Sequence, residues 1–91
     1  MKFVYSVWFR NPNTTPDDQD YEWVACFVID AADSQAALAW GDHIAQRYAA
    51  RVRDVLLSSE VTDISLAEGS DLDQLPMVAD GEDVSDEIIG W

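Results

Sequence analysis

Two segments rich in aromatic and β-branched residues place the strongest constraint on how this chain can fold. Residues 2–10 read KFVYSVWFR and residues 21–30 read YEWVACFVID. Such side chains favour extended backbone, whereas the intervening residues 11–20, NPNTTPDDQD, concentrate the types found in loops. The sequence therefore predicts two strands that pair as an antiparallel hairpin with a long polar loop.

Neither predicted strand has a cleanly polar side. Alternate side chains of a strand point to opposite faces. In the first strand one face carries Phe3, Tyr5, Val7 and Phe9 and the other carries Val4, Ser6 and Trp8. In the second strand one face carries Tyr21, Trp23, Ala25, Phe27 and Ile29 and the other carries Glu22, Val24, Cys26, Val28 and Asp30. A sheet with one solvated face alternates apolar and polar residues, so we expect this sheet to be covered, at least partly, on both faces.

The clearest single element is an amphipathic helix from Ser34 to about Arg53. Asp33 is the expected N-cap, and the segment is rich in Ala without Pro or a β-branched run. At 100° per residue one stripe holds Ala37, Trp40, Gly41, Ile44, Tyr48 and Val52. Glycine disfavours a helix interior, so Gly41 in this stripe predicts a close approach between the helix and the sheet.

The remaining signals complete an α+β fold. Residues 55–66 predict a third strand because Val, Ile and Thr dominate the second half, and residues 75–78 predict an edge strand or an extended segment. We expect one domain, 1–91, with an antiparallel sheet of three to four strands in the order β-β-α-β and the long helix on one face. Its C-terminal segment, 67–91, is acidic and partly irregular.

One helix covers only one face of such a sheet. The other face must then be covered by residues 72–91 folded back, or by a second copy of the chain. Both alternatives stay open at this point, and we expect a homodimer because small domains bury both faces of a sheet with difficulty.

The net charge of −13 comes from 18 acidic and 5 basic residues. Residues 1–53 hold 7 acids and 5 bases, whereas residues 54–91 hold 11 acids and no base. Direct binding to nucleic acid or to an anionic membrane is therefore not expected, since both need clustered Lys and Arg. The 48% content of hydrophobic residues argues against a disordered acidic tail and for a folded domain.

The acidic segment predicts a docking surface for a basic protein partner, although such a face can also serve only solubility. The candidate partner-binding residues combine carboxylates with one aromatic anchor: Asp71, Asp73, Asp80, Glu82, Asp83, Asp86, Glu87 and Trp91. An alternative is an inhibitor or immunity-type protein that mimics nucleic-acid phosphate. A further alternative is a small enzyme or ligand-binding domain with a pocket between sheet and helix, lined by Trp40, Tyr48 and strand aromatics.

No catalytic residue, cofactor or metal site is predicted. The only histidine, His43, falls on the polar side of the helix, and Cys26 lies in mid-strand, where a thiol behaves as a small hydrophobe. The loop carboxylates Asp17, Asp18, Asp20 and Glu22 resemble the start of a calcium loop, but Trp23 stands where that motif needs glycine. The single cysteine and the lack of a long apolar stretch lead us to expect a cytoplasmic protein.

Overall fold

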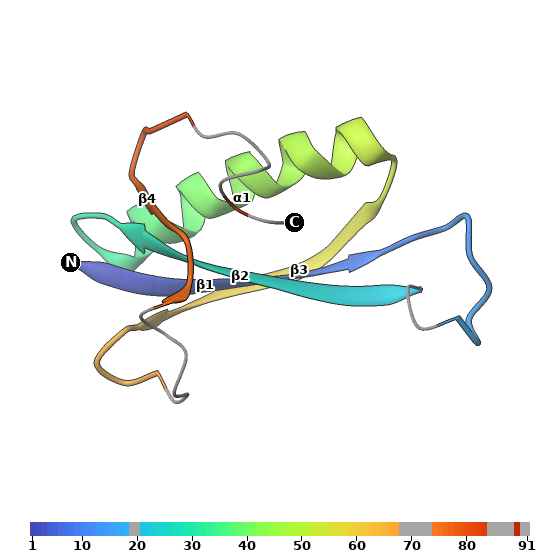
Figure 1. Cartoon of the computed structure of the whole chain (residues 1–91). Coiled ribbons are helices and arrows are strands. Elements are labelled where there is room, and N and C mark those ends of the chain that lie inside the picture. Colours follow the sequence, from blue (N-terminus) through green and yellow to red (C-terminus); the bar gives the residue numbers. More distant parts are fainter. Residues whose placement is uncertain (19–20, 68–73, 84–88, 90–91) are drawn as a thin grey trace.

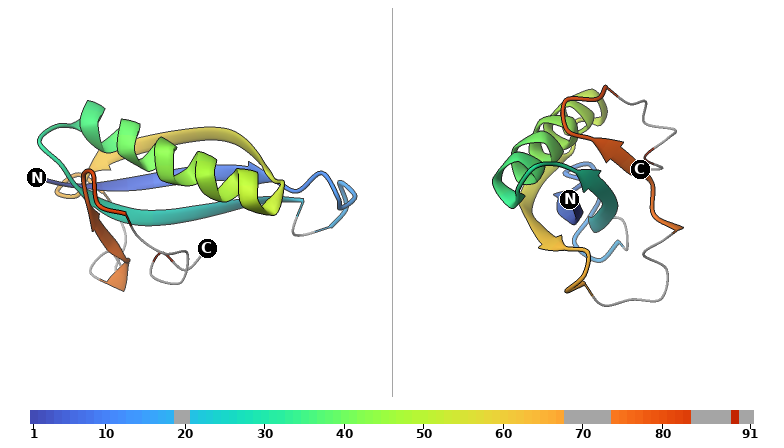
Figure 2. Two further views of the ribbon diagram at one scale, coloured as in Figure 1. Left: turned by 90° about the horizontal axis from the view of Figure 1, so that it is seen from above. Right: turned by 90° about the vertical axis from the view of Figure 1, so that its left-hand side faces the viewer.

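The computed structural model describes residues 1–18, 21–67, 74–83 and 89, and within them the predicted α+β fold is confirmed. The elements are β1 (Lys2–Arg10), β2 (Glu22–Asp30), α1 (Ser34–Val52), β3 (Val55–Asp63) and β4 (Met77–Ala79). The strands form a single sheet in the spatial order β3-β1-β2-β4 (Figure 1). Figure 2 shows α1 lying lengthwise over one side of this sheet.

The long-looped hairpin is confirmed, and its register fixes which side chains share a face. β1 and β2 pair antiparallel from Lys2 opposite Asp30 to Arg10 opposite Glu22. β3 pairs antiparallel with the other side of β1, with a register shift between Trp8 and Phe9. The odd-numbered residues of β1, starting at Phe3, therefore face α1, and the even-numbered ones face away.

The direction of β4 corrects the expectation of a purely antiparallel sheet. Met77, Val78 and Ala79 pair parallel with Val28, Ile29 and Asp30 of β2. Antiparallel pairing follows naturally from a tight turn between neighbouring strands, but β4 joins the sheet edge opposite to β3. Residues 64–76 separate β3 from β4, which is far longer than the tight turn that joins antiparallel neighbours.

The helix begins and ends close to the predicted residues. The carboxylate of Asp33 accepts a hydrogen bond from Ala36 N at 2.8 Å, which is the geometry of an N-cap. Arg53 ends the helix in the left-handed region, with φ of 63°. Val52, placed on the apolar stripe by its periodicity, is instead exposed because it is the last helical residue.

The main core lies between α1 and the sheet. Its fully buried large side chains are Tyr5, Val7, Phe9, Phe27, Ile29 and Val78. An added Cβ on Gly41 would overlap the ring of Tyr5, so the close helix–sheet approach predicted at this glycine is present. Ile89, the one described residue beyond Asp83, is buried in this same helix-side core.

Candidate functional site: the open sheet face and the acidic segment

Among the residues that the structure describes, those on the sheet face turned away from α1 are buried at one end and more exposed at the other. Val4 and Val28 face away from the helix and are nevertheless buried, with 9% and 3% of their surfaces exposed. Two connecting segments reach this end: Ile64 N donates to Lys2 O at 3.1 Å, and Val28 N donates to Pro76 O at 2.8 Å. Ile64, just after β3, and Pro76, just before β4, thus both lie at this end of the sheet.

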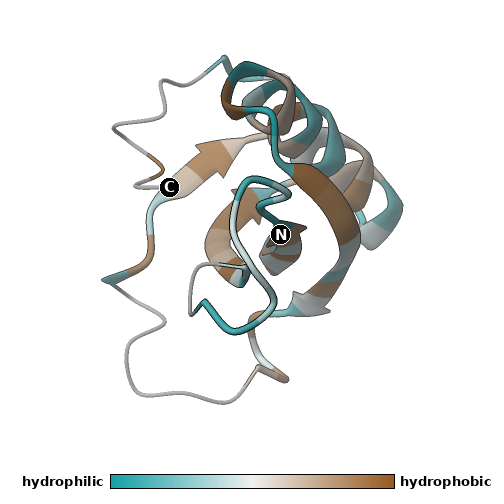
Figure 3. Ribbon diagram, turned by 90° about the vertical axis from the view of Figure 1, so that its right-hand side faces the viewer, coloured by the Kyte–Doolittle hydropathy of each residue, from teal (hydrophilic) through white to brown (hydrophobic). Residues whose placement is uncertain are grey.

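The other end of this face presents apolar side chains to solvent. Trp8 lies opposite Val24 in the sheet, and Arg10 lies opposite Val55. Val24 is 51% exposed and Val55 is 48% exposed, while Trp8 is half-buried. We call Trp8, Val24 and Val55 the open patch. Figure 3 shows that β3 begins with hydrophobic residues directly after the helix, where Val55 lies.

Polar groups flank the open patch on the same face. Arg10 donates from Nη2 to Glu22 Oε1 at 2.9 Å, and its guanidinium lies 5.2 Å from the ring centroid of Tyr21. Ser6 Oγ and Cys26 Sγ are 3.3 Å apart, on directly opposite residues of β1 and β2. Cys26 is half-buried, in keeping with a packed thiol rather than an exposed nucleophile.

Only three of the eight candidate partner-binding residues lie in the described part of the chain. Asp80, Glu82 and Asp83 are exposed in the turn that follows β4; the other candidates, Asp71, Asp73, Asp86, Glu87 and Trp91, fall outside the described residues. The turn is fixed by hydrogen bonds from Asp80 N to Asp30 O at 2.8 Å and from Glu82 N to Ala79 O at 2.9 Å. The three exposed carboxylates thus belong to one turn, which is anchored beside the end of β2.

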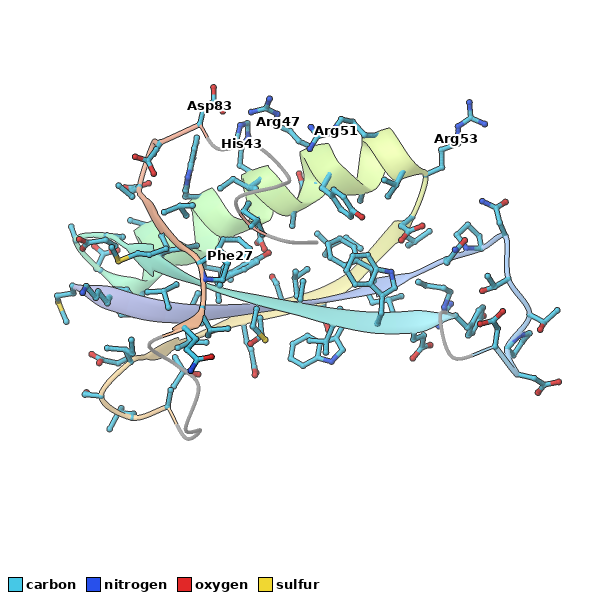
Figure 4. The ribbon with its side chains drawn as sticks, in the orientation of Figure 1. Phe27, His43, Arg47, Arg51, Arg53 and Asp83 are labelled. Carbon is cyan, nitrogen blue, oxygen red and sulfur yellow. The ribbon has the colours of Figure 1, made fainter. Side chains whose placement is uncertain are left out.

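The acidic segment contacts the chain's own helix. Arg47 Nη1 donates to Asp83 Oδ1 at 2.7 Å, and Figure 4 shows Asp83 above α1 on the side of His43, Arg47 and Arg51. A shallow hollow lined by Ile44, Arg47, Arg51 and Asp83 has about 10 Å³ of room, roughly that of one water molecule. This contact was not predicted from the sequence, although a signal was present: three of the five Lys and Arg residues lie in residues 47–53.

A second polar contact that the sequence analysis missed joins three elements inside the fold. The Asp42 carboxylate of α1 accepts from Tyr5 Oη of β1 at 2.7 Å and from Ser59 Oγ of β3 at 2.5 Å. Burial, and then the neighbouring Asp42, raise the pKa of the Tyr5 phenol well above its ordinary value of 10.0. Because Tyr5 is fully buried, this cluster is a structural tie rather than a reactive site.

The raised pKa of Tyr5 predicts a loss of stability in alkali. The folded protein keeps the phenol protonated, whereas the unfolded chain releases this proton near pH 10, so the contribution is complete below pH 10 and falls as the pH rises further. We expect the free energy of unfolding to fall by up to about 1.4 kcal/mol per pH unit there. Urea titrations across this range measure the slope. Tyr5→Phe should flatten this slope; an equal slope in Tyr5→Phe and in the unmodified chain would refute the assignment.

A small enzyme or ligand-binding domain, the further alternative, would have its pocket between sheet and helix. Aromatic rings fill this space in the structure. The Phe9 ring stacks on Trp23 with centroids 4.5 Å apart, and Tyr48 meets both rings edge-on at 5.9 Å. Trp40 is half-buried and stacks on the exposed imidazole of His43 at 5.0 Å. The side chains named for such a pocket thus pack against one another or against the helix surface.

The structure describes three of the four hairpin-loop carboxylates that resemble the start of a calcium loop. In the hairpin loop Asp17 and Asp18 are exposed, while Glu22 is bound by Arg10 and Asp20 falls outside the described residues. Within the described ranges, no cluster of three His, Cys, Asp or Glu side chains is placed to hold a metal ion. Nor does any helix there have the length and apolarity to cross a membrane.

Comparison of the chain with protein-family models, with curated proteins and with solved structures finds no match. The open patch and the acidic segment are therefore interpreted from their own chemistry.

Proposed function

We propose that this chain is a non-enzymatic protein-binding module that works as a homodimer and docks a basic partner through its acidic C-terminal segment. The observation that carries the proposal is the open patch, in which Trp8, Val24 and Val55 leave apolar surface exposed on a sheet face. Contiguous apolar patches on small soluble domains commonly mark interaction sites, and half-buried tryptophan is a frequent anchor residue in such sites.

A second copy of the chain is the occupant that best fits the open patch. A twofold contact places the same patch on both sides of the interface, so apolar surface meets apolar surface. Arg10 and Glu22 flank the patch and pair with each other at 2.9 Å, so their opposite charges offset one another beside the proposed contact. The patch covers only part of a three-stranded face, and interfaces at the small end of the size range are weak, so we expect dissociation in the micromolar range.

The acidic segment supports the second half of the proposal. Asp80, Glu82 and Asp83 are exposed at one turn, and the Arg47–Asp83 pair shows that this turn accepts a guanidinium group. A basic protein segment carries the same group. Attraction between opposite charges weakens with added salt, so docking of this kind has a measurable signature.

Replacing Val24 with lysine tests the dimer. Val24 is already half-exposed in the single chain, so Val24→Lys leaves the helix-side core intact but places a charge in the proposed contact. We expect at least about a tenfold weaker self-association, measured by sedimentation equilibrium.

The matched control is Leu66→Lys, which makes the same charge change at an apolar residue that is 75% exposed outside the open patch. This control should associate as well as the unmodified chain or slightly better, because it lowers the net negative charge. Equal dissociation constants for the two lysine variants would contradict the proposed interface.

A further inference from the structure

The acidic segment and the C-terminal half of α1 form an internal pair of opposite charges. Residues 54–91 contain no base, whereas Arg47, Arg51 and Arg53 are three of the five Lys and Arg residues in the chain. Arg47 and Arg51 are one helical turn apart and therefore project on the same side of α1. The fold brings the Asp83 carboxylate to this side, and Arg47 binds it.

We infer that Arg47 is an internal competitor for the acidic segment, so that a basic partner competes with this guanidinium for the Asp83 carboxylate. The inference rests on the proposed docking role of the segment and adds its regulation. One oxygen of Asp83, Oδ1, already accepts from Arg47 Nη1 at 2.7 Å. The guanidinium or ammonium group of a basic partner would compete with Arg47 as a donor to the same oxygen.

The solvent exposure of the Arg47–Asp83 pair determines how strongly it should reduce partner affinity. The Arg47 side chain is 51% exposed and that of Asp83 is 80% exposed. Exposed ion pairs are weak, and their contribution corresponds to a change of up to about fivefold in an equilibrium constant. The competition is therefore a moderate reduction of partner affinity rather than a complete block.

Hydrogen exchange at two backbone amides of the same turn tests the Arg47–Asp83 pair in the absence of a binding partner. Asp80 N donates to Asp30 O and Glu82 N donates to Ala79 O, so their hydrogen exchange measures how often the turn opens. In Arg47→Gln we expect both amides to exchange faster, by up to about fivefold. Arg53→Gln removes the same charge from the end of the helix, away from Asp83, and should leave the exchange unchanged (Figure 4).

Binding of nona-arginine, measured by titration calorimetry at low salt, gives the second readout. Arg47→Gln should bind the peptide more tightly than Arg53→Gln, again by up to about fivefold, because both variants have the same net charge and only the first removes the Arg47–Asp83 hydrogen bond. Equal exchange rates and equal affinities in the two variants would overturn the inference. Failure of the unmodified chain to bind nona-arginine would instead overturn the docking role, while faster exchange in Arg47→Gln alone would still establish the internal pair.

Discussion

Gly41→Ala is expected to destabilise the protein by about 2 kcal/mol or more, and to lower its Tm by about 10 °C. Alanine is favoured over glycine in a helix by about 1 kcal/mol, so helix propensity alone predicts the opposite sign. The added methyl group would overlap the Tyr5 ring, which is fully buried and held through its hydroxyl by Asp42. The ring has no free space to move into, and the steric cost therefore exceeds the gain in helix propensity.

Thermal unfolding of two further variants isolates the steric effect. Ala50→Gly, at an exposed site of the same helix, measures helix propensity alone and should cost about 1 kcal/mol. In a Tyr5→Leu background the Gly41→Ala change should lose most of its penalty, since the obstructing ring is gone. A Gly41→Ala variant more stable than the unmodified chain would show that α1 does not approach β1 this closely.

Phe9→Ala is expected to cost about 3–5 kcal/mol, which is a large share of the stability of a domain of this size. Phe9 is fully buried, and its ring contacts Trp23 and Tyr48, so truncation opens a cavity where β1, β2 and α1 meet. Urea unfolding followed by far-ultraviolet circular dichroism measures the loss. Aromatic neighbours cannot collapse easily into such a cavity, which places the cost toward the upper part of the range.

The adjacent residue supplies the control for this prediction. Trp8 precedes Phe9 in β1 but faces away from α1 and is only half-buried. Trp8→Ala should therefore lower the free energy of unfolding less than Phe9→Ala does. Trp8→Ala should also weaken self-association, whereas the main effect of Phe9→Ala should be on stability. The reverse order of stabilities would mean that the two faces of β1 have been exchanged.

The sequence was sufficient to predict the elements because their signals are local. Aromatic and β-branched residues mark β1 and β2, and Asp33 marks the start of α1 within one residue. The alternation along β1 and β2 also separated Trp8 from Phe9 and Val24 from Trp23, but it did not indicate which face of each strand the helix covers.

The contacts that were missed join residues far apart in the chain. Tyr5 and Asp42 are 37 residues apart, and Arg47 and Asp83 are 36 apart, so no local periodicity connects them. The parallel direction of β4 depends in the same way on the path of a long connection rather than on the composition of three residues. The count of charged residues suggested a basic partner for the acidic segment, but it did not indicate that an arginine of α1 pairs with this segment within the chain.

Sedimentation equilibrium of the unmodified chain at two salt concentrations is the most direct test of the proposed function. Net charge −13 on each copy opposes association, so a dimer held by the apolar open patch should strengthen when salt is raised from low to about 0.15 M ionic strength. We expect a mass that rises toward twice 10.2 kDa at high micromolar concentration, and does so more readily at the higher salt concentration. A mass that stays at 10.2 kDa under both conditions would contradict the account.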